Sequence, residues 1–184
     1  MEWTASIMST IFTVGHSTHS LDAFVALLGR HEVELVADVR AFPHSRRHPW
    51  FDAEALAADL PVAYRHFRTL GGRRQPRADS PNGGWAVAAF QGYADHSLTP
   101  DFASAIDELT ALARGTATAI MCAEGLWWRC HRRLIADRLT VMGWTVRHIE
   151  PGGGLAEHAL PPFAAPQPDG TVLYPPPATL FDDA

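Results

Sequence analysis

The sequence has no lysine, only two cysteines and no long apolar run; all of its 15 basic residues are arginine. Two cysteines cannot build the disulfide framework of a small secreted domain, so we expect a reducing compartment. No apolar stretch approaches the roughly 18 residues that a membrane helix needs. The N-terminus also lacks the basic start and apolar core of a signal peptide. We therefore predict a cytoplasmic protein that does not contact membranes.

Acidic side chains outnumber basic ones and give a formal net charge of -5. This balance argues against indiscriminate binding to nucleic acid. The segment from Arg40 to Arg77 reverses it locally, because that segment holds eight arginines and three acids. An arginine cluster suits a phosphate, a carboxylate or a short single strand. We expect an anionic small molecule as the partner, with single-stranded nucleic acid as the alternative.

Apolar runs typical of buried strands alternate with segments of helical spacing, which predicts an α/β fold with right-handed crossovers. A length of 184 residues is enough for one domain with a sizeable core. We predict three layers, with helices on both faces of a mainly parallel sheet of about five strands. Residues 1–10 are expected to be flexible, residues 11–150 to form the α/β domain, and the proline-rich residues 151–184 to pack on it as an extended tail. The expected strands are residues 11–14, 34–39, 62–67, 117–122 and 145–149.

Polar residues follow four of these strands, at the point where each strand ends. The carboxyl ends of parallel strands meet at one edge of a sheet, and open α/β sheets bind ligands there. We therefore expect four groups of side chains to converge on one cleft. The groups are His16 and Ser17, then Asp38 and Arg40, then Gly71, Gly72 and Arg73, and finally Cys122 and Glu124.

The segment from Met121 to Arg132 contains both cysteines, a carboxylate, a histidine and two arginines. It joins the fourth strand to a helix whose apolar pattern covers Arg133–Met142, and we expect the first turn of that helix to include Cys130. Free backbone N–H groups and neighbouring cations favour a thiolate there and lower its pKa. Cys130 is therefore predicted to be a nucleophile or a redox thiol. A small buried residue that packs the helix on the sheet is the alternative.

Other polar residues are assigned roles around this thiol. Glu124 is a candidate general base, and His16 or His131 would move protons. The alternatives are an ion pair between Glu124 and either Arg40 or Arg132, and a His16 ring bonded to the backbone. The predicted binding residues are Ser17, Asp38, Arg40, Ser45, Arg46, Gly71, Gly72, Arg73, Tyr93, Cys122 and Arg132, of which Arg40, Arg46 and Arg132 would hold the anion.

Cys122, Cys130 and His131 carry the sulfur and nitrogen ligands that zinc prefers. Their C-x7-C-H spacing is not a standard zinc pattern, because an adjacent cysteine and histidine rarely both reach one ion. We predict no metal and no other cofactor, with zinc as the alternative. Cys122, at the end of a buried strand, is expected to be mainly structural.

Short motifs follow one another in a specific order: Gly15-His16-Ser17, Asp38-Val39-Arg40, Pro43 to Arg46, Leu70-Gly71-Gly72, Gly92-Tyr93, Cys122-Ala123-Glu124, Cys130-His131-Arg132, His158 to Phe163 and Leu173-Tyr174-Pro175. The ordered set resembles the domain-of-unknown-function 488 family over about residues 11–177. One departure is Trp127, which stands where the family pattern has a proline. The resemblance implies a compact α/β domain and brings no established activity.

Two other functions are alternatives to an enzymatic one. Residues 65–77 carry arginines close to Trp85, Phe90 and Tyr93, a mixture of charge and stacking surfaces that a nucleic-acid-binding module would use. A structural or partner-binding domain would instead keep its polar cluster buried and mutually satisfied, with no cavity.

Overall fold

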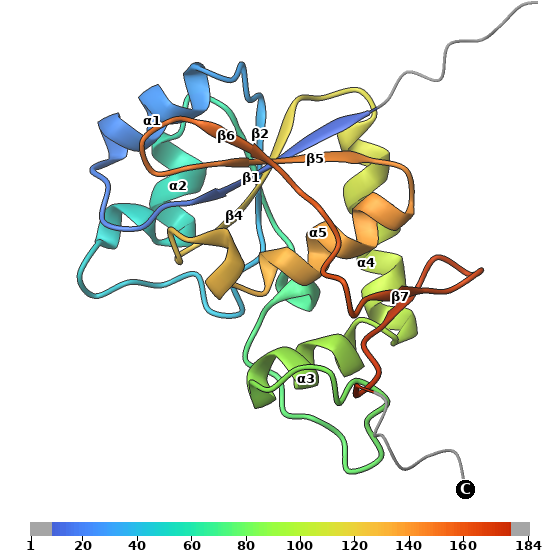
Figure 1. Ribbon diagram of the computed structural model, residues 1–184. Coiled ribbons are helices and arrows are strands. Elements are labelled where there is room, and N and C mark those ends of the chain that lie inside the picture. Colours follow the sequence, from blue (N-terminus) through green and yellow to red (C-terminus); the bar gives the residue numbers. More distant parts are fainter. Residues whose placement is uncertain (1–8, 178–184) are drawn as a thin grey trace, which may run out of the picture.

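The computed structural model describes residues 9–177, which fold around one six-stranded sheet (Figure 1). The spatial order of the strands is β3-β2-β4-β1-β5-β6. All five predicted strands are present and parallel, and a sixth, antiparallel strand pairs with β5. The strands are β1 (Thr10–Gly15), β2 (Leu35–Asp38), β3 (Ala63–His66), β4 (Thr118–Cys122), β5 (Thr145–Ile149) and β6 (Leu155–Glu157).

Helices cover both faces of the sheet, which confirms the predicted three layers (Figure 1). One apolar cluster joins Phe24 of α1 and Leu56 of α2 to the sheet, and another joins Ile106 of α4 and Ile135 of α5 to the opposite face. The helices are α1 (Leu21–Gly29), α2 (Ala53–Asp59), α3 (Ala88–His96), α4 (Pro100–Ala113) and α5 (Arg132–Val141), with short 3-10 helices η1 (Pro49–Phe51), η2 (Arg68–Leu70) and η3 (Trp127–Arg129).

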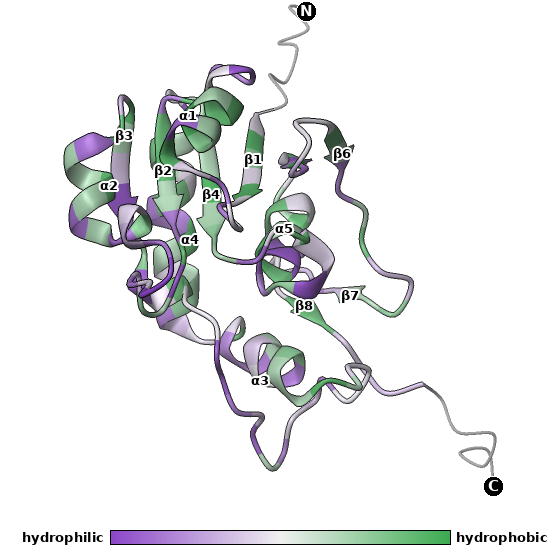
Figure 2. Ribbon diagram, turned by 90° about the vertical axis from the view of Figure 1, so that its left-hand side faces the viewer, coloured by the Kyte–Doolittle hydropathy of each residue, from purple (hydrophilic) through white to green (hydrophobic). Residues whose placement is uncertain are grey.

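The central strands are apolar on both faces, as Figure 2 shows for β2 and β4. Successive side chains of a strand point to opposite faces. Met121 accordingly packs with the cluster under α1 and α2, whereas Ile120 and Cys122 pack with the cluster under α4 and α5. The last residue of β4 therefore directs its sulfur to the side of the sheet where α5 begins.

Capping side chains fix where the helices start. Ser20 and Thr99 accept hydrogen bonds from the backbone N–H groups of Ala23 and Phe102, as expected for N-caps. Asp52 precedes α2 without capping it, because its carboxylate accepts the backbone N–H of Ser45 instead. This contact ties the loop between β2 and α2 to the start of α2.

Residues 151–177 run back along the domain. They first supply β6, which was expected as extended tail, and so raise the strand number of the sheet to six. They then form a second, two-stranded sheet from β7 (Ala165–Pro166) and β8 (Val172–Leu173). Residues 1–8 of the predicted flexible start and 178–184 of the predicted tail lie outside the described residues. None of the helices within residues 9–177 combines the length and the apolar character that a membrane span requires.

Candidate functional site

A cavity of about 690 Å³ opens at the carboxyl edge of the sheet. The structure brings together side chains from all four strand ends in its wall, because β1, β2, β3 and β4 are neighbours in the sheet and parallel. Residues that line it include His16, Arg40, Phe42, Ser45, Gly72, Arg73, Phe90, Tyr93, Cys122, Glu124, Arg129, Cys130 and His131. A wholly internal polar network with no cavity does not describe this edge.

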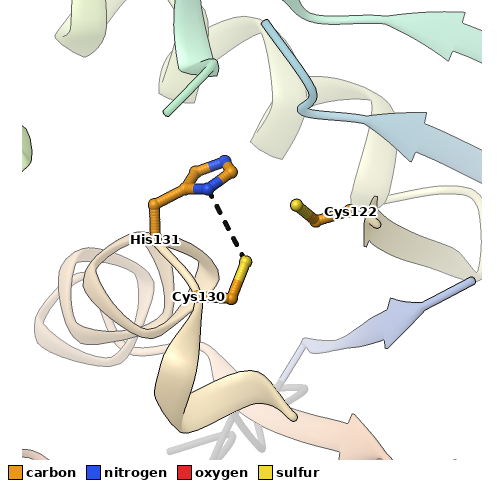
Figure 3. Close-up of side chains that lie close together, drawn as sticks. All are labelled: Cys122, Cys130 and His131. Atoms are coloured by element: carbon orange, nitrogen blue, oxygen red, sulfur yellow. Dashed lines mark hydrogen bonds between the residues drawn. The ribbon is translucent and has the colours of Figure 1, made fainter. Parts of the chain in front are cut away.

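Two cysteines and a histidine form the floor of this cavity, and their side chains point toward one another (Figure 3). The Sγ atoms of Cys122 and Cys130 and a ring nitrogen of His131 all lie within 4.8 Å of one another. Cys130 was predicted in the first turn of α5. It lies instead between η3 and α5 in extended conformation, because the short 3-10 helix ends there and α5 begins only at Arg132.

The His131 ring is held in one orientation. Its Nε2 lies 2.9 Å from the carbonyl oxygen of Val39, and a carbonyl only accepts, so Nε2 carries a hydrogen. Its Nδ1 then faces Cys130 Sγ at 3.6 Å. Gly72 leaves room for the ring, since a Cβ at Gly72 would lie 2.8 Å from Nδ1. The Tyr93 ring packs against the imidazole at 5.0 Å between centroids. The nitrogen that can exchange a proton with the Cys130 thiol is therefore Nδ1.

Arg132 lies behind Cys130, and none of its side chain is exposed. Its Nε donates to Cys130 Sγ at 3.5 Å, Nη1 donates to Thr13 Oγ1 at 3.3 Å, and Nη2 donates to the backbone carbonyl of Glu124. Arg132 therefore does not line the cleft, where it was predicted to hold the anion. It contacts the backbone of Glu124 rather than the Glu124 carboxylate, so the ion pair suggested as an alternative is absent between these two residues. That carboxylate lines the cavity and accepts the backbone N–H of Leu126.

The two thiols have opposite acidities. Burial raises the pKa of the Cys130 thiol, but a hydrogen bond from Cys122 and the nearby His131 and Arg132 outweigh it, so the net pKa lies well below the usual value. The pKa of Cys122 is raised well above its usual value by its hydrogen bond to Cys130 and by burial. The negative charge of the pair therefore resides on Cys130.

Asp38 and Arg40 form a buried ion pair at the end of β2. The Asp38 carboxylate accepts from Arg40 Nε at 2.9 Å, from Arg40 Nη2 at 2.6 Å and from the Tyr64 hydroxyl at 2.7 Å. Burial and the Arg40 charge lower the pKa of His16 to about 4, so His16 is neutral at pH 7. Its Nδ1 then donates to the Ser17 carbonyl at 3.0 Å and its Nε2 accepts from Arg40 Nη1 at 3.3 Å. The His16 ring is thus bonded to the backbone, as one alternative has it, and it also lines the cavity. Its role in moving protons stays a prediction.

Arg46 does not join Arg40 in an anion-binding fork. It is exposed, and it lines a neighbouring hollow with Ser17 and Ser45. Ser45 shapes the loop, since its hydroxyl accepts the backbone N–H of His48. The exposed arginines of the main cavity are instead Arg73, which was predicted, and Arg129, which was not.

Gly71 and Tyr93 support the loop that forms one wall of the cavity. A Cβ at Gly71 would lie 2.6 Å from the Cα of Ala41, so only glycine lets the two backbones approach this closely. The Tyr93 hydroxyl donates to the Leu70 carbonyl at 2.7 Å. Both residues position the loop after η2, which carries Gly72 and Arg73.

Two buried histidines behind the floor were assigned no role from the sequence, although His158 begins one of the ordered motifs. Thr13 Oγ1 lies 2.7 Å from His148 Nδ1, and His148 Nε2 lies 2.9 Å from His158 Nδ1. His158 Nε2 donates to Asp137 at 2.7 Å, and the Tyr174 hydroxyl donates to the other oxygen of that carboxylate. Burial and His158 lower the pKa of His148 to about 3, so it is neutral at pH 7. A continuous series of hydrogen bonds thus connects Arg132, through Thr13 and the two histidines, with Tyr174 in the C-terminal segment.

Trp127, which replaces an expected proline, has a defined role in this region. It starts η3 and stacks on the His148 ring, with 4.0 Å between centroids and 5° between planes. The turn before Cys130 is thereby packed against the buried histidines.

Two of the three rings that the nucleic-acid alternative needs are packed, whereas Phe90 lines the cavity. Trp85 is 7% exposed and Tyr93 1% exposed. The Arg133 guanidinium lies over Trp85 at 4.6 Å from the ring centre. Neither ring offers a free face for stacking of bases.

The family described as "Domain of unknown function DUF488" matches residues 20–139. The chain belongs to the DUF488 family. This confirms the family that the ordered motifs indicate, over a shorter range than the expected residues 11–177. The DUF488 match contains both cysteines, His131 and Arg132, and it leaves out His16 and the two buried histidines, His148 and His158. No curated protein matches the chain.

Proposed function

We propose that this DUF488 protein is a thiol-dependent enzyme in which Cys130 attacks an electrophilic centre of a small anionic molecule. The observation that supports this most strongly is the position of the Cys130 sulfur. It lies between the Arg132 guanidinium and the His131 imidazole, on the floor of the cavity.

The charge of Arg132 favours the thiolate. A buried cation is costly unless an anion or several acceptors compensate it. Among residues 9–177, no carboxylate forms an ion pair with Arg132, and its oxygen partners are an uncharged hydroxyl and a backbone carbonyl. A thiolate at Cys130, which already accepts from Nε, supplies the missing negative charge.

His131 is placed to carry the proton. The thiol of Cys130 faces Nδ1, and the Val39 carbonyl keeps the ring from turning. The ring takes the thiol proton as the nucleophile forms and returns it to the leaving group, which is the role of the base in an activated cysteine pair. His16, neutral and bonded at both nitrogens, orients Arg40 instead.

The cavity wall selects an anionic substrate with an apolar part. Arg73 and Arg129 are exposed at the cavity, where guanidinium groups suit carboxylate or phosphate. Phe42 is 66% exposed and lies with Phe90 in the same wall. A volume of about 690 Å³ is within the range for small-molecule sites.

The test compares alkylation by iodoacetate, an anion, with alkylation by neutral iodoacetamide. In the Cys122→Ser variant, which leaves Cys130 as the single thiol, we expect rapid alkylation at pH 6 and a preference for iodoacetate. When Arg73→Gln and Arg129→Gln are added to this variant, the preference for iodoacetate should become smaller, while the rate of alkylation by iodoacetamide stays the same. The Cys130→Ser variant should react slowly at this pH. A Cys130 that reacts only as an ordinary thiol, near pH 8.5, would refute the proposal.

A further inference from the structure

We infer that Cys122 is a resolving thiol, and that the dithiol of Cys130 and Cys122 reduces low-molecular-weight disulfides that carry carboxylate groups. The inference rests on the proposed role of Cys130 as the nucleophile. It adds a second reactive residue, a reaction and a substrate class to it.

The geometry places the two sulfurs within reach of each other. Cys122 ends β4 on the face that α5 covers, and Cys130 lies on that same face, just before α5. Their Sγ atoms, with His131, lie within 4.8 Å, and both line one cavity. A disulfide needs about 2.05 Å between sulfurs, so a small side-chain movement must bring them together. Cys130 lies outside regular helix, in a turn that can supply that movement.

The surroundings of the two sulfurs indicate that Cys130 attacks first and that Cys122 resolves the mixed disulfide. The Cys130 sulfur lies 3.5 Å from Arg132 Nε and 3.6 Å from His131 Nδ1, while the Cys122 sulfur is buried at the end of β4. Once Cys130 has formed a mixed disulfide, its negative charge is gone. His131, whose ring nitrogen lies within 4.8 Å of the Cys122 sulfur, can then take the proton of Cys122. The attacking thiol and the resolving thiol therefore act in a fixed order.

The reaction is balanced with a substrate R–S–S–R. The Cys130 thiolate attacks one sulfur, a mixed disulfide forms, and R–S⁻ leaves and takes the proton of the His131 imidazolium. Cys122 then passes its proton to His131 and attacks the Cys130 sulfur, and the second R–S⁻ leaves with that proton. The protein dithiol is oxidised to a disulfide and the substrate is reduced to two thiols. An external thiol or dithiol reductant restores the protein.

The cavity favours an organic disulfide over hydrogen peroxide. Hydrogen peroxide occupies only a small part of about 690 Å³ and has no anionic group for a pair of exposed guanidinium groups. Arg73 and Arg129 suit carboxylates, and Phe42 and Phe90 provide an apolar wall.

The experiment uses dithiobis(nitrobenzoate), an aromatic disulfide with a carboxylate on each half, added in a 1:1 ratio to the reduced full chain. We expect two nitrothiobenzoate ions to be released for each reagent molecule. The protein should carry no adduct and should be lighter by two hydrogens. The Cys122→Ser variant should release one ion and retain the adduct on Cys130. This wild-type mass measurement needs no substitution, so it does not depend on how the variant folds.

Each outcome has one meaning. A wild-type protein that reacts rapidly but keeps the adduct would overturn the resolving role and leave the nucleophile intact. Slow reaction at Cys130 in both proteins would overturn the proposed function itself. Cystamine is a disulfide with amines in place of carboxylates. It should react several-fold more slowly with the wild type than with the Arg73→Gln and Arg129→Gln double variant. Equal rates would contradict the inferred preference for disulfides that carry carboxylates.

Discussion

The Nε atom of Arg132 lies 3.5 Å from the sulfur of Cys130, and the whole Arg132 side chain is buried. This contact explains how a largely buried thiol can be acidic. The guanidinium belongs to the first turn of α5, and its other donors are satisfied by Thr13 and by the Glu124 carbonyl. The cation is thus fixed in place by neutral partners, and its charge acts on the sulfur.

Replacing Arg132 by glutamine should raise the pKa of Cys130 and slow its alkylation at pH 6 by at least tenfold. It should also lower the free energy of unfolding by about 3–5 kcal/mol, the usual cost of breaking a buried charge pair. The measurements are the pH profile of alkylation and urea denaturation. Arg133→Gln removes the same charge from the next position of α5, over Trp85, and should leave the pH profile unchanged. An Arg132→Gln profile identical to that of the wild type would contradict the assignment.

Alanine at Gly72 should displace the His131 ring, because the new Cβ would lie 2.8 Å from Nδ1 and 3.2 Å from Cγ. We expect slower alkylation of Cys130 by several-fold and a stability loss of about 1–3 kcal/mol, as for other overpacked sites. Gly115→Ala is the matched control, since nothing lies within 4 Å of its Cβ. Unchanged reactivity in Gly72→Ala would show that the imidazole does not need its present position.

Acid should destabilise the fold through His16 between pH 6.5 and about 4. Its pKa is lowered to about 4 by burial and Arg40, so the unfolded chain binds a proton in this range and the folded chain does not. Stability is therefore complete above pH 6.5 and falls with pH, by about 3 kcal/mol at most from this group. Urea denaturation at pH 7, 5.5 and 4.5 measures the slope.

The His16→Gln variant should show a shallower slope that does not vanish, because His148, with a pKa of about 3, acts in the same direction. A wild-type stability that is flat from pH 7 to 4.5 would argue against a neutral, buried His16.

Zinc should protect Cys130 from alkylation, and a chelator should reverse the protection. With Zn–S of about 2.3 Å and Zn–N of about 2.0–2.1 Å, a tetrahedral site separates sulfur and nitrogen by about 3.6 Å. Cys130 Sγ and His131 Nδ1 are 3.6 Å apart. The Nε2–H bond to Val39 is also the kind of support that metal-binding histidines use. His131→Asn should weaken the protection at least tenfold, whereas loss of the exposed His44 should not; zinc without effect on the wild type would show that the three atoms cannot adapt to an ion.

Much of this architecture could be predicted from residue patterns. The apolar runs placed all five parallel strands, and strand ends alone predicted that His16, Arg40, Gly72 and Cys122 meet, because topology fixes where parallel strands finish. The direction of Arg46 could not be predicted in this way, since it lies on a loop whose path depends on contacts such as Ser45 with Asp52.

The buried polar groups were beyond the reach of periodicity. Arg132, Asp137 and Arg138 are buried in α5, whereas a pattern of apolar positions assigns charged residues to the exposed face of a helix. His148 and His158 meet because β6 turns back along β5, a pairing with no strong signal in a short strand of three residues. Tertiary contacts, rather than local sequence, decide these positions.

The order of strands in the sheet has a practical consequence for the family match. Residues 20–139 contain β2, β3 and β4 and omit β1, which lies between β4 and β5. A fragment cut at those limits would leave one side of β4 without its neighbour, and unpaired strand edges recruit other chains. Such a fragment should aggregate rather than fold, because the sequence shared with the family is shorter than the unit that folds.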